Sequence, residues 1–224
     1  MKTPIIKVAV VDNHKLFRSG LIPIIDNFEG MKVIIDADGG EILLKKMKET
    51  VPHVILLDIK MPVMSGMDVA RILRKKYPKV KIIMLTMYEH PSMITSVYKI
   101  GVHGYILKST DPEEVEKAIH SVMDTGFYFS PTTSMAFLRN LVKDSSIDFN
   151  FKNDVFFEDH ELLVISYICE ELTSKEIAEK FCSLHKMQVD VRTIDRYKSE
   201  IIEKLGVKNS LGIVVYALRS GIVE

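Results

Sequence analysis

The chain has 224 residues, of which 47% are hydrophobic, so it is long enough for one or two domains with a sizeable core. Its 30 Lys and Arg balance its 30 Asp and Glu, and this net charge of zero excludes an overall field that would draw the whole chain to nucleic acid or membrane. No segment approaches the ~20 apolar residues of a membrane span, and the N-terminal apolar run is too soon interrupted for a signal peptide, so we expect a cytoplasmic protein with no membrane contact.

Short apolar runs alternate with amphipathic stretches through residues 1–125. The runs predict strands at 7–11, 32–37, 53–57, 81–86 and 104–108. The stretches between and after them have apolar residues at helical spacing and predict helices at 15–28, 40–49, 66–76, 91–100 and 111–124. Such alternation is typical of an α/β fold, in which helices cover both faces of a parallel sheet.

The rest of the chain has no strand pattern. One short helical stretch (134–142) and a polar stretch predict a linker over residues 128–155. From residue 156 onward the apolar spacing predicts an all-α domain with helices at 158–170, 173–183, 190–205 and 208–220. We therefore predict a first domain over residues 1–127, a linker with a short helix over 128–155, and a helical domain over 156–224.

Two cysteines, Cys169 and Cys182, lie in apolar contexts at helical spacing, with no metal-binding spacing around them. A cytosolic protein keeps such thiols reduced, and free Cys is among the most buried residue types. We therefore predict two buried free thiols.

Polar residues follow four of the five expected strands. Asp12 and Asn13 follow the first, Asp58 the third, Thr86 the fourth and Lys108 the fifth. In an open α/β sheet, ligands bind beyond the carboxyl ends of the strands. Carboxylates can hold Mg²⁺, while a hydroxyl and an ammonium can neutralise phosphoryl oxygens. This set of residues predicts phosphoryl chemistry at that edge.

Asp12-Asn13, "LLDIKMP", "LTM" and "GYILKS" resemble, in order and spacing, the motifs of response-regulator receiver domains of two-component signalling. The resemblance spans residues 5–125. It implies a doubly wound, five-stranded, flavodoxin-like fold and a sensor histidine kinase as partner. It also implies that Asp58 is the phosphoacceptor, a nucleophile that forms an acyl phosphate.

The resemblance implies a role for each neighbouring residue. Thr86 and Lys108 would bond phosphoryl oxygens, and Tyr105 would be a switch aromatic that turns inward when Thr86 moves toward the phosphoryl group. Mg²⁺ would be held by Asp58, Asp12 and the backbone carbonyl of Lys60.

One departure from the family pattern concerns the second residue after the first strand. Family members usually have an acid there, whereas this chain has Asn13. An amide oxygen can still ligate Mg²⁺, but because it brings no charge we expect weaker Mg²⁺ binding and slower phosphorylation. We interpret the adjacent His14 as a surface or helix-start histidine, since Mg²⁺ prefers oxygen ligands.

The segments "TSKEIAEKF" and "VRTIDRYKSEIIEKLGVKNS" resemble the helix-turn-helix of LuxR-type regulators, although the connection at 182–190 is longer than the family's turn. The helix at 190–205 would enter the major groove of DNA. The last helix, at 208–220, is the usual dimer contact and would also complete a four-helix core. The candidate DNA-binding residues are Lys175, Arg192, Thr193, Arg196, Lys198, Ser199 and Lys208.

Together these features predict a response regulator of the NarL/FixJ type. Phosphorylation of Asp58 would control homodimer formation and the binding of promoter DNA, and the chain would be a transcription regulator and not an enzyme. Residues 156–224 hold 9 basic and 12 acidic residues, so we expect weak DNA binding by a monomer and stronger binding by a dimer on paired half-sites.

Two alternatives remain open. The first is a phosphorylation-independent regulator or protein-interaction module with a degenerate receiver, which Asn13 and the long connection would favour. The second is a phosphohydrolase of the haloacid-dehalogenase type. Such an enzyme needs a second catalytic aspartate two residues after the nucleophile, where this chain has Lys60.

Overall fold

The computed structural model describes residues 5–87, 96–97, 99–128 and 155–223. The chain divides into two compact units, and we describe each by itself. The sheet unit comprises Met1–Met123 and Tyr128–Ser130, and the helical unit comprises Asp124–Phe127 and Pro131–Glu224. The expected short helix at 134–142 lies outside the described residues, as does nearly all of the expected linker, so both stay predictions.

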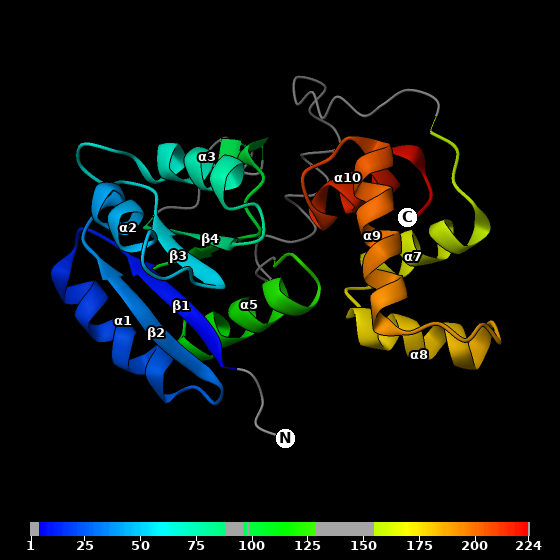
Figure 1. The fold of residues 1–224 in the computed structure, drawn as a ribbon, viewed down its shortest axis with the longest axis horizontal. Coiled ribbons are helices and arrows are strands. Elements are labelled where there is room, and N and C mark those ends of the chain that lie inside the picture. Colours follow the sequence, from blue (N-terminus) through cyan, green and yellow to red (C-terminus); the bar gives the residue numbers. More distant parts are fainter. Residues whose placement is uncertain (1–4, 88–95, 98, 129–154, 224) are drawn as a thin grey trace. The chain divides into compact units, whose positions relative to one another are not determined.

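The sheet unit is built on five parallel strands in the order β2-β1-β3-β4-β5. The strands lie side by side in Figure 1, with β1 and β3 in the interior. This order is that of the flavodoxin-like doubly wound fold, so the predicted fold class is confirmed. The strand bounds are Ile6–Val11 for β1, Met31–Ala37 for β2, Val54–Asp58 for β3, Lys81–Thr86 for β4 and Gly104–Leu107 for β5.

Helices cover both faces of the sheet, with α1 and α5 on one face and α2 and α3 on the other (Figure 1). Of the helix expected at 91–100, residues 96, 97, 99 and 100 are helical, and the others lie outside the described residues. The helix bounds are Lys15–Asn27 for α1, Gly40–Lys46 for α2, Gly66–Lys76 for α3 and Pro112–Asp124 for α5.

The core of the sheet unit explains why its strands read as almost uninterrupted apolar runs. Residues Val54 to Asp58 of β3 are all buried, because successive side chains point to opposite faces and a helix layer covers each face. Leu56 belongs to the cluster that packs against α1 and α5. A sheet with one solvated face would have shown polar residues at alternate positions.

Four helices form the described part of the helical unit from residue 155 onward, as the apolar spacing predicted. Their bounds are Asp159–Cys169 for α7, Ser174–Leu184 for α8, Val191–Leu205 for α9 and Ser210–Ser220 for α10. Thr173 and Glu176 form a capping box at the start of α8, and the Asp190 side chain accepts from the Thr193 amide at the start of α9. Gly206 ends α9 with φ +71°, a left-handed conformation that favours glycine.

The last helix, α10, packs against α7 and α9. An added Cβ on Gly212 would lie only 2.4 Å from Val207 Cβ, so this close approach requires glycine. The buried apolar residues of α10 therefore belong to the core of the helical unit, while its role as a dimer contact stays a prediction.

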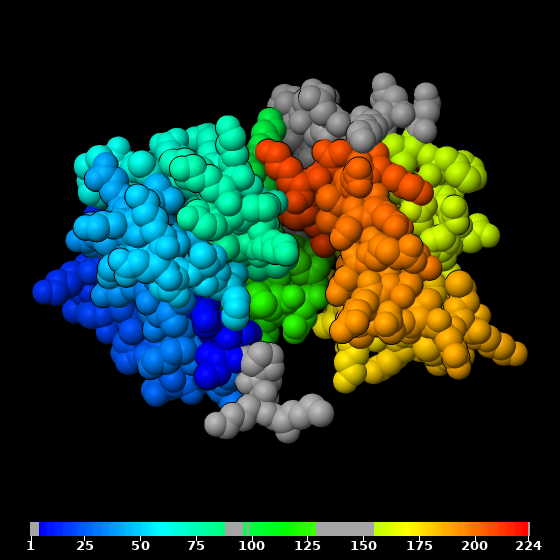
Figure 2. Space-filling model, viewed as in Figure 1, coloured from blue at the N-terminus to red at the C-terminus, as the bar shows by residue number. Residues whose placement is uncertain are grey.

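The space-filling view shows that side chains cover the backbone of each unit on the viewed face (Figure 2). Across the described parts of the chain, the helices are too short or too polar to cross a bilayer.

The prediction of two buried thiols is wrong for Cys182, which is exposed, while Cys169 is half-buried. The buried face of α8 runs through Ile177, Ala178 and Phe181, and the next residue along the helix turns away from it. An apolar neighbourhood in the sequence therefore did not mean an inward-facing position. Burial, with a smaller contribution from the charge of Glu170, raises the pKa of the Cys169 thiol to about 12.

Candidate functional site

Four predicted site residues meet at the carboxyl edge of the sheet. Asp12 directly follows β1, Asp58 ends β3, Thr86 ends β4 and Lys108 directly follows β5. Because β1, β3, β4 and β5 are successive neighbours in the sheet, their ends bring these side chains together. All four side chains are buried, with the Lys108 side chain only 2% exposed.

The Lys108 ammonium joins the two buried carboxylates. Its Nζ lies 2.6 Å from Asp12 Oδ2 and 2.8 Å from Asp58 Oδ2. Burying a charge is costly unless it is paired, so each member of this trio depends on the others. Among the described residues, however, no hydrogen bond of good geometry reaches either Oδ2 atom. Ion-pair distance without hydrogen-bond alignment leaves both carboxylates able to accept another cation or a new bond.

Asp12 is held by its neighbours on α1. The Arg18 guanidinium donates to the Asp12 backbone carbonyl at 2.6 Å and forms an ion pair with Asp36. The His14 amide donates to Asp12 Oδ1 at 2.7 Å. These bonds fix the carboxylate at the start of α1 and aim it toward Asp58.

The loop after Asp58 needs a glycine at position 66. A Cβ on Gly66 would lie 2.0 Å from the Asp58 carbonyl oxygen, which no real side chain allows. The Gly66 amide donates to the Ile59 carbonyl at 2.9 Å, so α3 starts directly against the strand that carries Asp58. Only glycine at position 66 therefore allows this close return from β3 into α3.

His14 is the exposed N-cap residue of α1, as our interpretation of the sequence expected, but its ring also approaches the two carboxylates. Its Nδ1 lies 3.1 Å from Asp12 Oδ1 and 3.8 Å from Asp58 Oδ2. Within the described residues, Asp12, His14 and Asp58 form a group whose possible ligand atoms all lie within 4.8 Å of one another. The available signal was position, since a residue two places after a strand-end aspartate can turn back onto it at the helix start.

Asn13 and Lys60, the other expected metal ligands, have exposed side chains. The Lys60 amide lies 3.4 Å from Asp58 Oδ1, so its backbone runs beside the acceptor carboxylate. The roles of the Asn13 side chain and the Lys60 carbonyl as ligands stay predictions.

The two expected switch residues are both buried. Thr86 ends β4, and its carbonyl accepts from the Lys108 amide at 2.7 Å. Tyr105 lies inside the sheet unit on β5 and is 2% exposed, next to Met84 of β4 in the strand register. This inward position is the one that the switch hypothesis assigns to the phosphorylated chain, and movement of Tyr105 between two positions stays a prediction.

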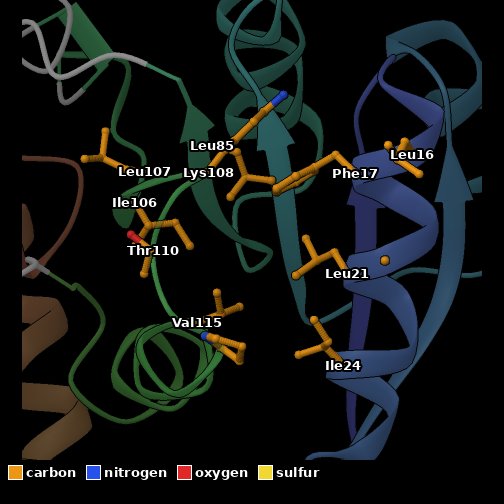
Figure 3. A pocket seen from close by; sticks show the side chains of 12 residues that line it. Leu16, Phe17, Leu21, Ile24, Leu85, Ile106, Leu107, Lys108, Thr110 and Val115 are labelled. Carbon is orange, nitrogen blue, oxygen red and sulfur yellow. The ribbon is translucent and has the colours of Figure 1, made fainter.

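A cavity of about 260 Å³ lies beside this edge, between α1 and the start of α5 (Figure 3). Its walls are mostly apolar and include Phe17, Leu21 and Val115, and the Lys108 side chain also lines it. The Lys108 ammonium lies 5.1 Å from the centre of the Phe17 ring, within the range of a cation–π contact. The cavity therefore lies beside the side chain of Lys108, which joins the Asp12 and Asp58 carboxylates.

The helical unit presents most of the predicted DNA-binding residues at its surface. Lys175, Arg192, Arg196, Ser199 and Lys208 are exposed. Two of these already have partners within α9, because Arg196 lies 3.6 Å from Glu200 and the Ser199 hydroxyl donates to the Asp195 carbonyl. The Thr193 hydroxyl donates to Asp190, so it takes part in the cap of α9.

Lys198 does not fit the role expected of it. It is only 7% exposed, and its ammonium donates to the Ser174 hydroxyl at 2.9 Å. Ser174 in turn donates to Asp195 at 2.6 Å, so Lys198 joins α9 to the start of α8. A buried lysine in this network is a structural residue of the helical unit, and its assignment as a DNA contact is wrong.

The long connection between α8 and α9 is anchored to the unit at its start. The Tyr167 hydroxyl and His185 Nε2 are 2.8 Å apart, and the Phe181 and His185 rings pack 5.7 Å apart. The Met187 amide donates to the Phe181 carbonyl at 3.1 Å. The connection therefore begins as an extension of α8 that packs against α7.

Comparison with known proteins adds to this geometry. Residues 8–120 match the response regulator receiver domain family. The chain is 30% identical to the transcriptional regulatory protein MctR of Rhizobium johnstonii, over 99% of this chain and 97% of that protein. It is 29% identical to the response regulator GacA of Pseudomonas aeruginosa, over 98% of both chains.

A solved structure of the RcsB response regulator of Salmonella typhimurium has the same fold over most of its length. The TM-score is 0.56 at 22% identity, and the alignment covers 96% of this chain and 99% of that one. RcsB is also known as a complex with DNA, which gives the same TM-score.

Proposed function

The chain belongs to the response regulator receiver family and is a response regulator of the NarL/FixJ type, and from this premise we propose that Asp58 accepts a phosphoryl group from a sensor histidine kinase. The acyl phosphate then controls the formation of a homodimer and its binding to promoter DNA. The observation that supports this role most directly is the burial of Asp58 between Asp12 and Lys108 at the carboxyl edge of the sheet.

In the transfer step, an oxygen of the Asp58 carboxylate attacks the phosphorus of a phosphohistidine. The phosphorus–nitrogen bond breaks, and the histidine nitrogen leaves with its electron pair and takes up a proton. Lys108, 2.8 Å from Asp58 Oδ2, turns its ammonium toward the new phosphoryl oxygens, and Thr86 donates its hydroxyl to another. These two residues neutralise charge that the buried edge of the sheet could not otherwise hold.

The residues at this edge fit a hard divalent cation, because two carboxylates converge with oxygens that no aligned hydrogen bond satisfies. Asp12, Asp58, Asn13 and the Lys60 carbonyl would hold Mg²⁺, which when bound supplies positive charge to the transferring phosphoryl group.

The output resides in the helical unit. The exposed side chains of α9, Arg192 and Arg196 above all, would face the major groove, and Lys175 and Lys208 would contact phosphates. The RcsB–DNA complex supports this assignment, since that protein shares the fold over 96% of this chain. In this reading the protein is a transcription regulator and not an enzyme.

Intact mass tests Asp58 as the acceptor. The chain is incubated with Mg²⁺ and acetyl phosphate, and we expect the wild type and Asp38→Asn to gain one phosphoryl group and Asp58→Ala to gain none. Asp38 is an exposed aspartate beyond β2, the edge strand, so its variant is a matched control. Equal gains in wild type and Asp58→Ala would refute the assignment.

A second candidate is a regulator that binds DNA without phosphorylation. The observation in its favour is Asn13, which leaves the metal site one charge short of the family pattern. A wild-type chain that gains no phosphoryl group, yet selects the same genomic fragments with and without phosphodonor, would favour this candidate.

A further inference from the structure

The His14 imidazole lies at the opening of the buried carboxylate pair. Its side chain is 55% exposed, whereas those of Asp12 and Asp58 are 0% and 4% exposed. An ion that approaches from solvent would therefore meet the imidazole and the two carboxylates together. The two carboxylates are the pair assigned above to Mg²⁺, so the following inference rests on the proposed function.

The three groups have the spacing of ligands around one small cation. At metal–ligand distances of ~2.1 Å, adjacent ligands of an octahedral ion are ~3.0 Å apart and opposite ligands ~4.2 Å apart. His14 Nδ1 is 3.1 Å from Asp12 Oδ1 and 3.8 Å from Asp58 Oδ2, which falls between these limits. The ligand atoms of all three groups lie within 4.8 Å of one another, so an ion can contact all three once the side chains move to within the ~4.2 Å limit.

The imidazole changes which ion this site prefers. Mg²⁺ takes oxygen ligands, whereas imidazole nitrogen suits transition ions, whose affinity rises from Mn²⁺ through Co²⁺ to Ni²⁺. Asn13 lacks the charge that a second acid would give to Mg²⁺, while His14 supplies a nitrogen that Mg²⁺ uses poorly. We propose that Asp12, His14 and Asp58 together bind a divalent transition-metal ion in preference to Mg²⁺, with His14 Nδ1 as the selecting ligand.

Lys108 must give way for such an ion, because its ammonium now joins both carboxylates. Its side chain also lines the cavity between α1 and α5, with the ammonium near the Phe17 ring (Figure 3). The cavity beside this side chain is space into which the ammonium would move on leaving the carboxylates. The same movement frees Lys108 to meet an arriving phosphoryl group.

Binding of Ni²⁺ and Mg²⁺ by the full-length chain tests the proposal. Ni²⁺ affinity is measured by calorimetric titration and Mg²⁺ affinity by the rise of the unfolding midpoint with ion concentration. We expect His14→Gln, which keeps a polar side chain but removes the imidazole, to lower the ratio of Ni²⁺ to Mg²⁺ affinity by about tenfold or more. The Co²⁺ complex adds a direct signature, since its visible absorption should shift when a nitrogen ligand is lost.

Two further variants assign the site. Asp58→Ala should lose the Ni²⁺ site, and His120→Ala, which removes an exposed histidine from α5, should bind Ni²⁺ like the wild type. An unchanged affinity ratio in His14→Gln, or Ni²⁺ binding that survives in Asp58→Ala, would overturn the proposal. The proposed function fails separately, because it requires phosphoryl transfer to Asp58 in the presence of Mg²⁺ whatever the ratio is.

Discussion

Burial sets what each ionisable residue of this chain can do. Asp12, Asp58 and Lys108 are held together because none of them could stay charged alone in the interior. Under the proposed function, the trio would keep the Asp58 carboxylate in a dry site, where a newly formed acyl phosphate would be protected from water. The same physics acts on buried groups outside the site, where it can be measured with fewer competing effects.

The two cysteines should differ sharply in reactivity. Cys182 is exposed, whereas burial raises the pKa of Cys169 to about 12, so almost no Cys169 thiolate exists at neutral pH. With a disulfide reagent at pH 8, we expect one thiol to react at least about tenfold faster than the other. The Cys182→Ser variant should retain only the slow thiol; a fast thiol that persists in this variant would contradict the assignment.

His103 should make the sheet unit less stable in mild acid. It is 3% exposed, its Nδ1 accepts from the Ile82 amide at 3.1 Å, and burial together with the charges of Lys81 and Arg74 lowers its pKa well below 6.5. The folded chain therefore keeps His103 neutral while the unfolded chain protonates it, so the stabilising effect is complete above pH ~6.5 and is lost as the pH falls below it.

The measurement for His103 is the free energy of unfolding between pH 7 and pH 5. We expect His103→Gln to reduce the slope of this free energy against pH, by at most ~1.4 kcal/mol per pH unit. Other histidines contribute equally to both chains, so they cancel in the comparison. Equal slopes in wild type and variant would mean that His103 is protonated in the folded state.

Residue identity alone predicted which side chains meet at the carboxyl edge of the sheet better than it predicted which residues of α9 are exposed. The polar residues at strand ends were recognisable because a parallel sheet must bring such ends together, whatever the details of packing. Lys198 was misassigned because the prediction relied on its charge and not on its position along α9. It falls in the apolar stripe of α9 between Ile194 and Ile201, a spacing that predicts an inward-facing residue.

At the scale of single elements, the junction of β3 and α3 is the tightest constraint near Asp58. Gly66→Ala would place a methyl group 2.0 Å from the Asp58 carbonyl oxygen, so the loop must move. We expect a loss of unfolding free energy on the order of 1–3 kcal/mol and slower phosphorylation from acetyl phosphate. Chemical denaturation and intact mass measure the two effects.

Gly20→Ala is the matched control for this junction. Gly20 lies within α1 with nothing within 4 Å of an added Cβ, so alanine should stabilise the helix by about 0.5–1 kcal/mol. If Gly66→Ala lowers the free energy of unfolding and Gly20→Ala raises it, the effect at Gly66 comes from its close approach to the Asp58 carbonyl oxygen. A neutral Gly66→Ala would show that the loop can shift freely.

Two residues of α9 that lie within one turn of each other are expected to have different roles, one in DNA contact and one in stability. Arg196 is exposed and Lys198 is buried against Ser174. We expect Arg196→Ala to weaken binding to selected DNA by about tenfold with little change in the unfolding midpoint, and Lys198→Ala to cost about 1–3 kcal/mol of stability. Thermal unfolding and DNA titration on both variants decide this; equal losses of DNA affinity at equal stability would restore Lys198 as a contact.

Element bounds were predictable wherever a cap or a glycine marks them. The start of α8 at the Thr173 capping box and the end of α9 at Gly206 follow from local backbone chemistry. The contact of His14 with Asp12 follows from its position two residues further along the chain. Its approach to Asp58 could not be predicted in the same way, because it depends on how α1 starts against β1 and β3 in the assembled sheet.

The whole molecule combines a sheet unit that buries two carboxylates with a helical unit whose net charge is weakly negative. Residues 156–224 hold 9 basic and 12 acidic residues, so their overall charge opposes binding to DNA. The attraction must come from local positive charge, and the four exposed candidates are Lys175, Arg192, Arg196 and Lys208. One helical unit therefore has little electrostatic affinity, and doubling the number of units on one site is the available way to increase it.

The salt dependence of DNA binding tests this account of the whole protein. Each neutralised phosphate contributes a slope of about −0.9 to the logarithm of affinity against the logarithm of salt, so four basic residues allow at most about −3.6 for one helical unit and about −7.2 for two. We expect the unphosphorylated chain to show the smaller slope on paired half-sites and the chain phosphorylated at Asp58 the larger one. Asp58→Ala treated with phosphodonor should keep the smaller slope. A chain that shows the larger slope before and after phosphorylation would already bind as a dimer, and control by Asp58 would then act at a step other than assembly on DNA.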